Sequence, residues 1–136
     1  MPAIPIGTKG ETKRRVTEDI AINFLGLEGA RVLATPAIVM LLEMTCRNSI
    51  VPLLDAGFDS VGTEVNVKHL AATPLGMEVT LYSEVIESDN RRVKFKVEAF
   101  DEKERVAEGT HERFVINVER FAGRLKEKIS SARRES

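Results

Sequence analysis

Residues 35–54, TPAIVMLLEMTCRNSIVPLL, constrain the fold more than any other stretch of the chain. The first turns are apolar on every side, which predicts a helix that is buried all round. Thr35 can cap its start, Pro36 fits its first turn, and Pro52 ends or kinks it. Glu43 interrupts the apolar run, and an ionised carboxylate without a partner is costly to bury. The surroundings of Glu43 are therefore the main question that this helix raises.

The composition favours a single domain, 1–136, with loose ends at 1–7 and 130–136. The chain has 43% hydrophobic and 30% charged residues, which is typical of a globular protein. A net charge of −1 gives no reason to expect nucleic acid or a membrane as a partner. The single cysteine, Cys46, excludes an intrachain disulfide and fits the cytoplasm, since no secretion signal or membrane-spanning segment is evident. His69 and His111 are the only histidines, so a metal site would need carboxylates, and no HExxH-like pair is present. We expect no metal or redox cofactor.

After the helix, the apolar period changes from helical to alternating. Strands are predicted at 60–69, 77–85, 93–99 and 105–118, with tight turns between them. In the first of these strands His69 shares the apolar face with Val61, Thr63, Val65 and Val67. A weaker alternation predicts another strand within 7–25, and helical spacing predicts a short helix at 118–128. The pattern is irregular around Gly109, where we expect a β-bulge.

These elements assemble into an α+β fold. The apolar face of an antiparallel sheet needs a cover, and the central helix is the only large apolar element in the sequence. The sheet is therefore expected to curl around this helix. One such layer leaves sheet edges and a flank of the helix open, so we expect a homodimer formed through sheet edges, with a tetramer also possible.

Two inward side chains could carry chemistry. His69 on the apolar face and Glu43 on the helix would provide an imidazole and a carboxylate for acid–base work. Each also has a purely structural interpretation. His69 could be a satisfied core histidine, Glu43 could pair with Arg47 one turn later, and Thr35 could serve only as a helix cap.

The remaining polar residues are more ambiguous. Cys46 is best interpreted as a small buried hydrophobe. Arg113 could bind an anionic group or form an ion pair with a nearby glutamate. The alternation does not decide on which face of its strand His111 lies. The basic residues of 91–96 favour a solvated strand face, with contact to ligand phosphates as the alternative.

Three segments resemble a known family: HLAATPLGMEVTLYSEV, GTHERFVI and VERFAGRLKEK. They are similar to the fluoroacetyl-CoA thioesterase family of the hot-dog-fold superfamily, over about residues 33–128. This resemblance implies a long helix wrapped by an antiparallel sheet, dimeric assembly and an acyl-CoA site at the dimer interface.

The resemblance also implies roles for individual residues. The catalytic threonine, glutamate and histidine of the family fall on Thr35, Glu43 and His69. Substrate-binding positions fall on Gly62 and Arg113. The region before Thr35 is shorter than in the fluoroacetyl-specific enzyme, with Phe24 as its only aromatic residue, so Phe24 is the candidate for contact with the acyl group and fluoroacetyl selectivity is not carried over.

The expected function is hydrolysis of a small or medium acyl-CoA to the free acid and CoA, with CoA present only as part of the substrate. An inward histidine and glutamate also suit a hydratase or dehydratase acting on acyl thioesters. A non-catalytic dimer that binds acyl-CoA or another small ligand is the third alternative. Release of free CoA distinguishes the first function from the other two.

Overall fold

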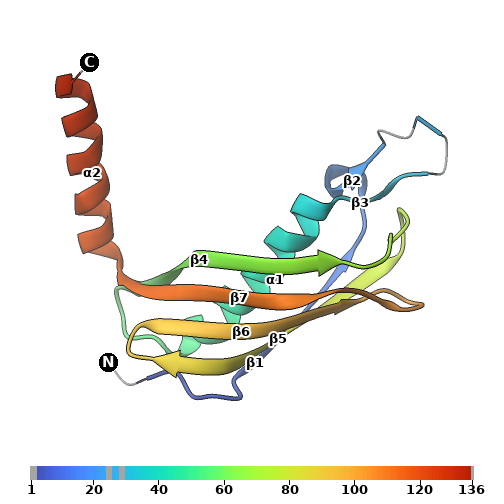
Figure 1. Cartoon of the computed structure of the whole chain (residues 1–136), viewed down its shortest axis with the longest axis horizontal. Helices are drawn as coiled ribbons and strands as arrows, with labels where there is room; N and C mark the ends of the chain where they lie inside the picture. Colours follow the sequence, from blue (N-terminus) through green and yellow to red (C-terminus); the bar gives the residue numbers. More distant parts are fainter. Residues whose placement is uncertain (1–2, 24–25, 28–29, 136) are drawn as a thin grey trace.

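The computed structural model describes residues 3–23, 26–27 and 30–135. Within these residues, five antiparallel strands form the main sheet, in the order β1-β5-β6-β7-β4 (Figure 1). Their bounds are Lys9–Arg15 for β1, Phe58–His69 for β4, Glu78–Asp89 for β5, Arg92–Phe100 for β6 and Arg105–Asn117 for β7. The four strands predicted after the helix are confirmed.

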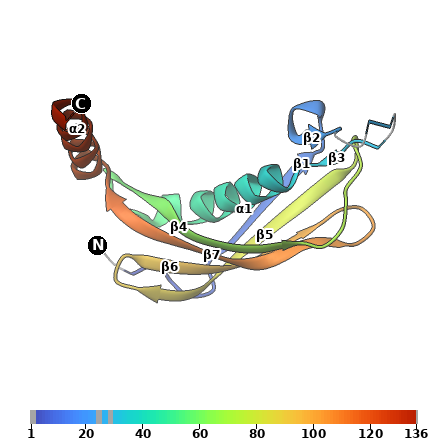
Figure 2. The same ribbon diagram turned by 45° about the horizontal axis from the view of Figure 1, so that its top comes forward.

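The sheet curls around helix α1, Thr35–Ile50, which lies in its concave face (Figure 2). Ile38, Leu42, Cys46 and Ile50 form one buried stripe along α1. These residues recur every four positions, so they lie on one side of the helix and pack on the apolar faces of the strands. A short 3₁₀ helix, Val51–Leu53, carries Pro52 and ends α1 as expected. The α+β class is therefore confirmed.

The expectation that α1 is buried all round is wrong for a single chain. Met40 and Met44 are 53% and 42% exposed. They lie opposite the buried stripe, because residues four apart share one side of a helix and residues two apart do not. A single sheet covers only one side of α1, and in one chain the other side is left open to solvent.

The N-terminal strand is shorter than the predicted 7–25. β1 ends at Arg15, and the next backbone N–H, that of Val16, donates to Met77 O in the β4–β5 loop (2.9 Å). The chain then forms a 3₁₀ turn, Glu18–Ile20, and a small second sheet in which β2, Ala21–Ile22, pairs with β3, Val32–Leu33. Residues 3–7 of the predicted loose segment 1–7 are held in place, since Ile4 is buried in the core.

The pairing of β7 with β6 shifts at Val106, three residues before Gly109, which agrees with the irregularity predicted near Gly109. A β-bulge that was not predicted lies in β4. The pairing of β4 with β7 shifts between Gly62 and Glu64, which leaves Thr63 as the extra residue. Gly109 itself pairs regularly with Val67 on one side and Val97 on the other. Gly109 is needed because β4 comes so close: a Cβ at this position would lie 2.0 Å from the Asn66 carbonyl oxygen.

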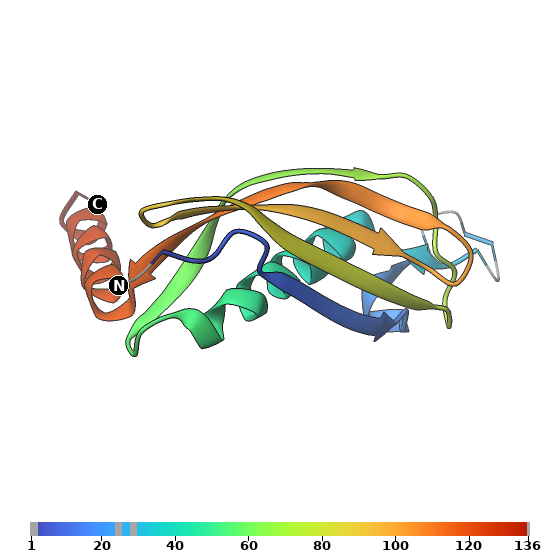
Figure 3. The same cartoon turned by 90° about the horizontal axis from the view of Figure 1, so that it is seen from below.

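Helix α2, Val118–Glu135, is longer than the predicted 118–128. No proline or glycine follows residue 123, and Arg133 and Arg134 in the last turn suit the negative end of the helix dipole, so residues 130–135 of the predicted loose tail are helical. Figures 1 and 3 show that α2 stands away from the end of the sheet. Among the described residues, no helix combines the length and apolar character needed to cross a membrane.

The close approach at Gly109 predicts a specific loss of stability. Replacing Gly109 by Ala forces the β4 backbone to move, which should lower the free energy of unfolding by about 1–3 kcal/mol, as for other overpacked sites. Urea unfolding followed by circular dichroism measures this change. Gly123→Ala in α2 is the matched control, because a Cβ there meets nothing within 4 Å. Equal stability of Gly109→Ala and the wild type would contradict this account of the β4–β7 pairing.

Candidate active site

The start of α1 and the end of β4 meet through one side-chain contact. Thr35 Oγ1 and His69 Nδ1 are hydrogen-bonded at 2.8 Å. Thr35 does not cap the helix: Ala34 is the N-cap residue, and no side-chain cap bond is formed. The cap interpretation of Thr35 is therefore wrong, and its hydroxyl is committed to the imidazole.

The other ring nitrogen of His69 is poised for a ligand. His69 Nε2 is buried and has no hydrogen-bond partner among the described residues. Burial lowers the pKa of His69 below its usual value, so the imidazole is neutral near pH 7. Whichever group donates in the contact with Thr35, Nε2 remains available to donate or accept a proton.

Glu43 lies on the same flank of α1 as Thr35, two turns further along. Its carboxylate faces β4, since Oε1 would lie 3.4 Å from a Cβ built on Gly62. The expected pairing of Glu43 with Arg47 is not formed. Arg47 instead binds Asp59 at the start of β4 through Nε (3.1 Å) and Nη2 (2.6 Å). Glu43 is therefore free of the neighbour that would have given it a purely structural role.

The bulge at Thr63 decides which β4 residues face the helix. An extra residue reverses the alternation of side chains along a strand. Before the bulge Ser60 and Gly62 face α1, and after it Val65, Val67 and His69 do so, as their register with inward residues of β7 indicates. The prediction that Val61 and Thr63 share the face of His69 is therefore wrong, and the bulge brings Gly62 to the side of Glu43.

Arg113 and His111 complete the surroundings of Glu43. Arg113 is buried and donates from Nε to Ser60 Oγ (2.6 Å) and from Nη2 to Ser60 O (2.8 Å). Its Nη1 lies 3.1 Å from His111 Nε2. A guanidinium can only donate, so Nε2 of His111 is the acceptor and its Nδ1–H donates to Glu64 O (2.8 Å). His111 is thus a neutral imidazole that positions Arg113.

Sequence reasoning did not assign His111 and Ser60 to this site. The spacing of β7 carried the signal for His111. Residues 107, 109, 111, 113 and 115 are two apart, so they share the inner face of the strand, and one of them, Val115, belongs to the core. Ser60 belongs to the inner face only because the bulge changes the register after it. Phe24, the candidate for acyl contact, lies outside the described residues.

Cys46 and the basic residues of 91–96 lie outside this cluster of polar side chains. Burial raises the pKa of the Cys46 thiol to about 12, which fits the predicted role of a small core residue. On the outer face of the sheet Arg92 pairs with Glu112 (2.5 Å). Lys94 pairs with Glu87 there (3.7 Å), so the predicted solvated face is the better interpretation of this segment.

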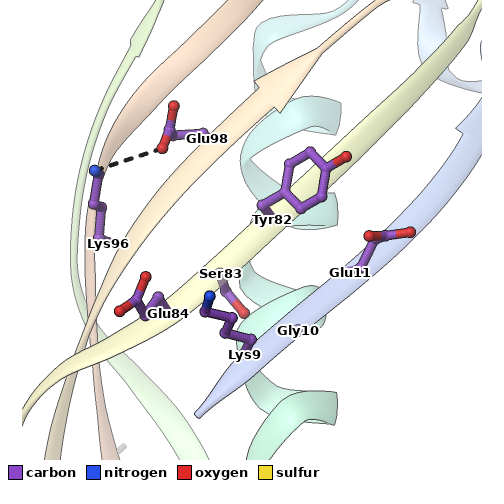
Figure 4. A pocket seen from close by; sticks show the side chains of 8 residues that line it. All are labelled: Lys9, Gly10, Glu11, Tyr82, Ser83, Glu84, Lys96 and Glu98. Carbon is purple, nitrogen blue, oxygen red and sulfur yellow. Dashed lines mark ion pairs between the residues drawn. The ribbon is translucent and has the colours of Figure 1, made fainter. Parts of the chain in front are cut away.

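One surface hollow among the described residues lies elsewhere. It measures about 390 Å³ and is formed by β1, β5 and β6, with Lys9, Tyr82 and Lys96 among its lining side chains (Figure 4). These residues alternate with inward ones, so the hollow opens on the sheet face away from α1. It contains none of the predicted site residues. We favour the Thr35–His69 and Glu43 region, because it combines the buried His111 and Arg113 with a His69 nitrogen that has no partner among the described residues.

The burial of the two histidines predicts a stability that depends on pH. Burial lowers the pKa of both His69 and His111 in the folded chain. The unfolded chain then binds more protons below its ordinary histidine pKa of about 6.5, so the free energy of unfolding should fall as the pH is lowered below that value. Urea unfolding from pH 7.5 to pH 5 measures the fall, and His69→Gln should reduce it. An NMR titration that gave either imidazole a pKa above 6.5 would contradict the prediction.

Comparison with known proteins identifies the family of the chain. Residues 16–119 match the family model described as fluoroacetyl-CoA-specific thioesterase. The chain is 39% identical over 101 residues to the fluoroacetyl-CoA thioesterase of Streptantibioticus cattleyicolor. The aligned region covers 74% of this chain and 73% of that protein.

Solved structures give the same result for the fold. A mutant of the fluoroacetyl-CoA-specific thioesterase in complex with fluoroacetate and CoA has a TM-score of 0.79 and 32% identity, covering 87% of this chain and 99% of that one. A thioesterase superfamily member from Thermus thermophilus has a TM-score of 0.82 and 28% identity, covering 96% and 99%. The fold is therefore the hot-dog fold of the thioesterases, and the chain belongs to the fluoroacetyl-CoA-specific thioesterase family.

Proposed function

We propose that this protein hydrolyses a small or medium acyl-CoA thioester to the free acid and CoA. The observation that carries the proposal is the row of functional groups on one flank of α1. The Thr35–His69 pair lies at the start of the helix, and Glu43 follows about 12 Å along it, as expected from the rise of eight helical residues. The substrate is the source of CoA, and the reaction as written needs neither a metal nor a redox cofactor.

Glu43 is the group that delivers the nucleophile. As a general base it takes a proton from water while the water oxygen attacks the thioester carbonyl carbon. Alternatively its carboxylate attacks the same carbon, and water then hydrolyses the resulting anhydride. In both routes the carbon–sulfur bond breaks, and the CoA thiolate leaves and takes up a proton.

His69 and Thr35 act on the carbonyl and on the leaving group. Thr35 holds Nδ1 of the neutral imidazole, which leaves Nε2 to donate a hydrogen bond to the carbonyl oxygen or a proton to the departing sulfur. The α1 start adds backbone N–H groups without intrahelical partners, which stabilise a developing negative charge. The Thr35 hydroxyl also positions the attacking water or the intermediate.

Gly62 and Arg113 shape the part of the site around Glu43. Backbone pairing is disrupted at the bulge, so the Gly62 N–H is a candidate donor to the oxyanion. A side chain at Gly62 would crowd His111 Cε1 at 3.1 Å and Glu43 Oε1 at 3.4 Å, which supports a role for glycine at this point. The buried Arg113 cation lies beside the same position and would attract the carboxylate product.

The acyl group is best defined by experiment. The Streptantibioticus cattleyicolor relative is a fluoroacetyl-CoA thioesterase, and Phe24 is the only aromatic residue before Thr35 in this chain. We therefore propose a small or medium acyl group without assigning fluoroacetyl selectivity. Thiol release from a panel of acetyl-, fluoroacetyl-, aromatic and longer acyl-CoAs identifies the preferred substrate.

The proposed working form is a cytoplasmic homodimer built through β4. Strand β4 is 12 residues long and forms one edge of the main sheet, so its outer backbone groups are available for another strand. Val65 of β4 and Met40 and Met44 of α1 are exposed on the same inner side of the chain. Antiparallel pairing of two β4 strands about a twofold axis would continue the sheet and cover these side chains.

The role of Glu43 gives a direct test of the proposed hydrolysis. Glu43→Gln keeps the size of the side chain but removes the base, so thiol release should fall by about 100-fold or more. The assay follows free CoA with a thiol reagent, and circular dichroism checks folding. Glu11→Gln on the exposed face of β1 is the matched control and should retain the wild-type rate. Full activity of folded Glu43→Gln would sink the proposed mechanism.

The proposed dimer predicts an effect of a charge on the open flank of α1. Met44→Asp would place a carboxylate in the interface and should shift the protein from dimer to monomer in sedimentation experiments. Tyr82→Asp is the control, because Tyr82 is similarly exposed on the opposite face of the sheet. A wild-type chain that sediments as a monomer, or a Met44→Asp dimer of unchanged affinity, would contradict the proposed interface.

A further inference from the structure

Helix α2 is the largest element of the chain whose apolar surface is uncovered. Val118, Leu125 and Ile129 lie on one side of this helix, since they are spaced by whole helical turns, and Leu125 and Ile129 are 47% and 52% exposed. Among the described elements, β7 supplies the main contacts of α2. An 18-residue helix with an open apolar side has little support from its own chain, which indicates that another surface covers it.

The position of α2 identifies that surface. In Figure 1 α2 extends past β4, the edge strand, in the direction in which a further strand would be added. It begins beside the start of β4, where the Val118 N–H donates to Gly57 O (2.9 Å). In an antiparallel β4–β4 pair, the start of one strand lies next to the end of the other. The end of β4 in the partner is His69, followed by the β4–β5 loop.

That end of the chain has a matching chemistry. The β4–β5 loop, residues 70–77, exposes Leu70 and Leu75, at 48% and 40%. The adjacent β6–β7 turn, residues 101–104, carries three acidic residues and one lysine. Within residues 118–134, by contrast, α2 carries more basic than acidic residues: Arg120, Arg124, Lys126, Lys128, Arg133 and Arg134 against Glu119 and Glu127. Both the apolar and the charged surfaces are therefore complementary.

We propose that α2 of each protomer packs on the β4–β5 loop and β6–β7 turn of its partner and supports the partner's Thr35–His69 pair. This inference rests on the dimer of the proposed function and goes beyond it, because it makes each site dependent on a helix of the other chain. The loop is directly connected to the site: it follows His69, and its Thr73 O accepts the N–H of Leu33, two residues before Thr35 (2.9 Å). The apolar side of α2 therefore acts as a positioning element in trans.

Cross-linking between chains tests the packing without any need for catalysis. Leu125→Cys and Leu70→Cys chains are mixed and treated with a short bis-maleimide. Within one chain these positions lie at opposite ends of β4, about 40 Å apart for 12 extended residues, so a short linker joins them only between chains. The native Cys46 is buried with a raised pKa and does not compete.

The expected result is a shift of the mixed dimers, which alone carry both cysteines, from 15.1 kDa chains to a product of twice that mass. Glu127→Cys, on the opposite side of α2, is the matched control and should cross-link poorly to Leu70→Cys. Equal cross-linking of the two α2 positions would overturn the proposal. The proposal would also be overturned if no cross-linked product formed although sedimentation showed a dimer. It would be overturned as well if α2 bound anionic lipid vesicles and made no contact with the partner in the dimer.

Mixed dimers test the support of the partner's site. A Leu125→Asp chain is combined with a His69→Gln chain, so that the only intact Thr35–His69 pair belongs to the Leu125→Asp chain and is covered by an unaltered α2. This dimer should keep the kcat/KM of an intact site. A chain with both substitutions combined with a wild-type chain should lose activity, because its altered α2 covers the intact site. If the first mixed dimer lost activity and the second kept it, the support of one site by the α2 of the other chain would be overturned. An inactive wild type that cross-links strongly would refute only the proposed hydrolysis.

Discussion

The buried stripe of α1 is the constraint on which the rest of the structure depends. Ile38, Leu42, Cys46 and Ile50 can be buried together only if α1 takes one rotation about its axis against the sheet. That rotation turns Thr35 and Glu43 toward β4 and leaves Met40 and Met44 exposed. The same packing that stabilises the core thus sets the place of the candidate site and of the uncovered flank.

A single extra residue in β4 then matches the strand to the helix. Without the bulge at Thr63, Gly62 and His69 would lie on opposite faces, since residues an odd number apart on a regular strand do so. With the bulge, Gly62 faces Glu43 while His69 still reaches Thr35. The buried Arg113 cation, held by Ser60 and His111, completes this arrangement at the point where Glu43 meets the strand.

Much of this arrangement could be predicted from the sequence, because it follows from local patterns. The alternation after residue 60, the apolar run around Glu43 and the inward direction of His69 predicted the wrapped helix and the approach of an imidazole. The bulge could not be placed, because Thr63 fits a regular alternation and the shift appears only when β4 is paired with β7. The role of Thr35 was equally hard to predict. A threonine at the start of a helix fits the pattern of a cap, and the local sequence does not show that its hydroxyl is hydrogen-bonded to the distant His69.

The central claim is that the acyl-CoA thioester binds between the Thr35–His69 pair and Glu43. The most direct measurement is a crystal structure with an acyl-CoA analogue that has a methylene between sulfur and carbonyl, which keeps the carbonyl but cannot be hydrolysed. The account predicts an analogue that lies along the flank of α1 between Thr35 and Glu43, with its carbonyl oxygen within hydrogen-bonding distance of His69 Nε2 or of the Gly62 N–H. An analogue bound in the outer-face hollow beside Lys9 and Tyr82, with the Thr35–His69 pair unoccupied, would contradict it.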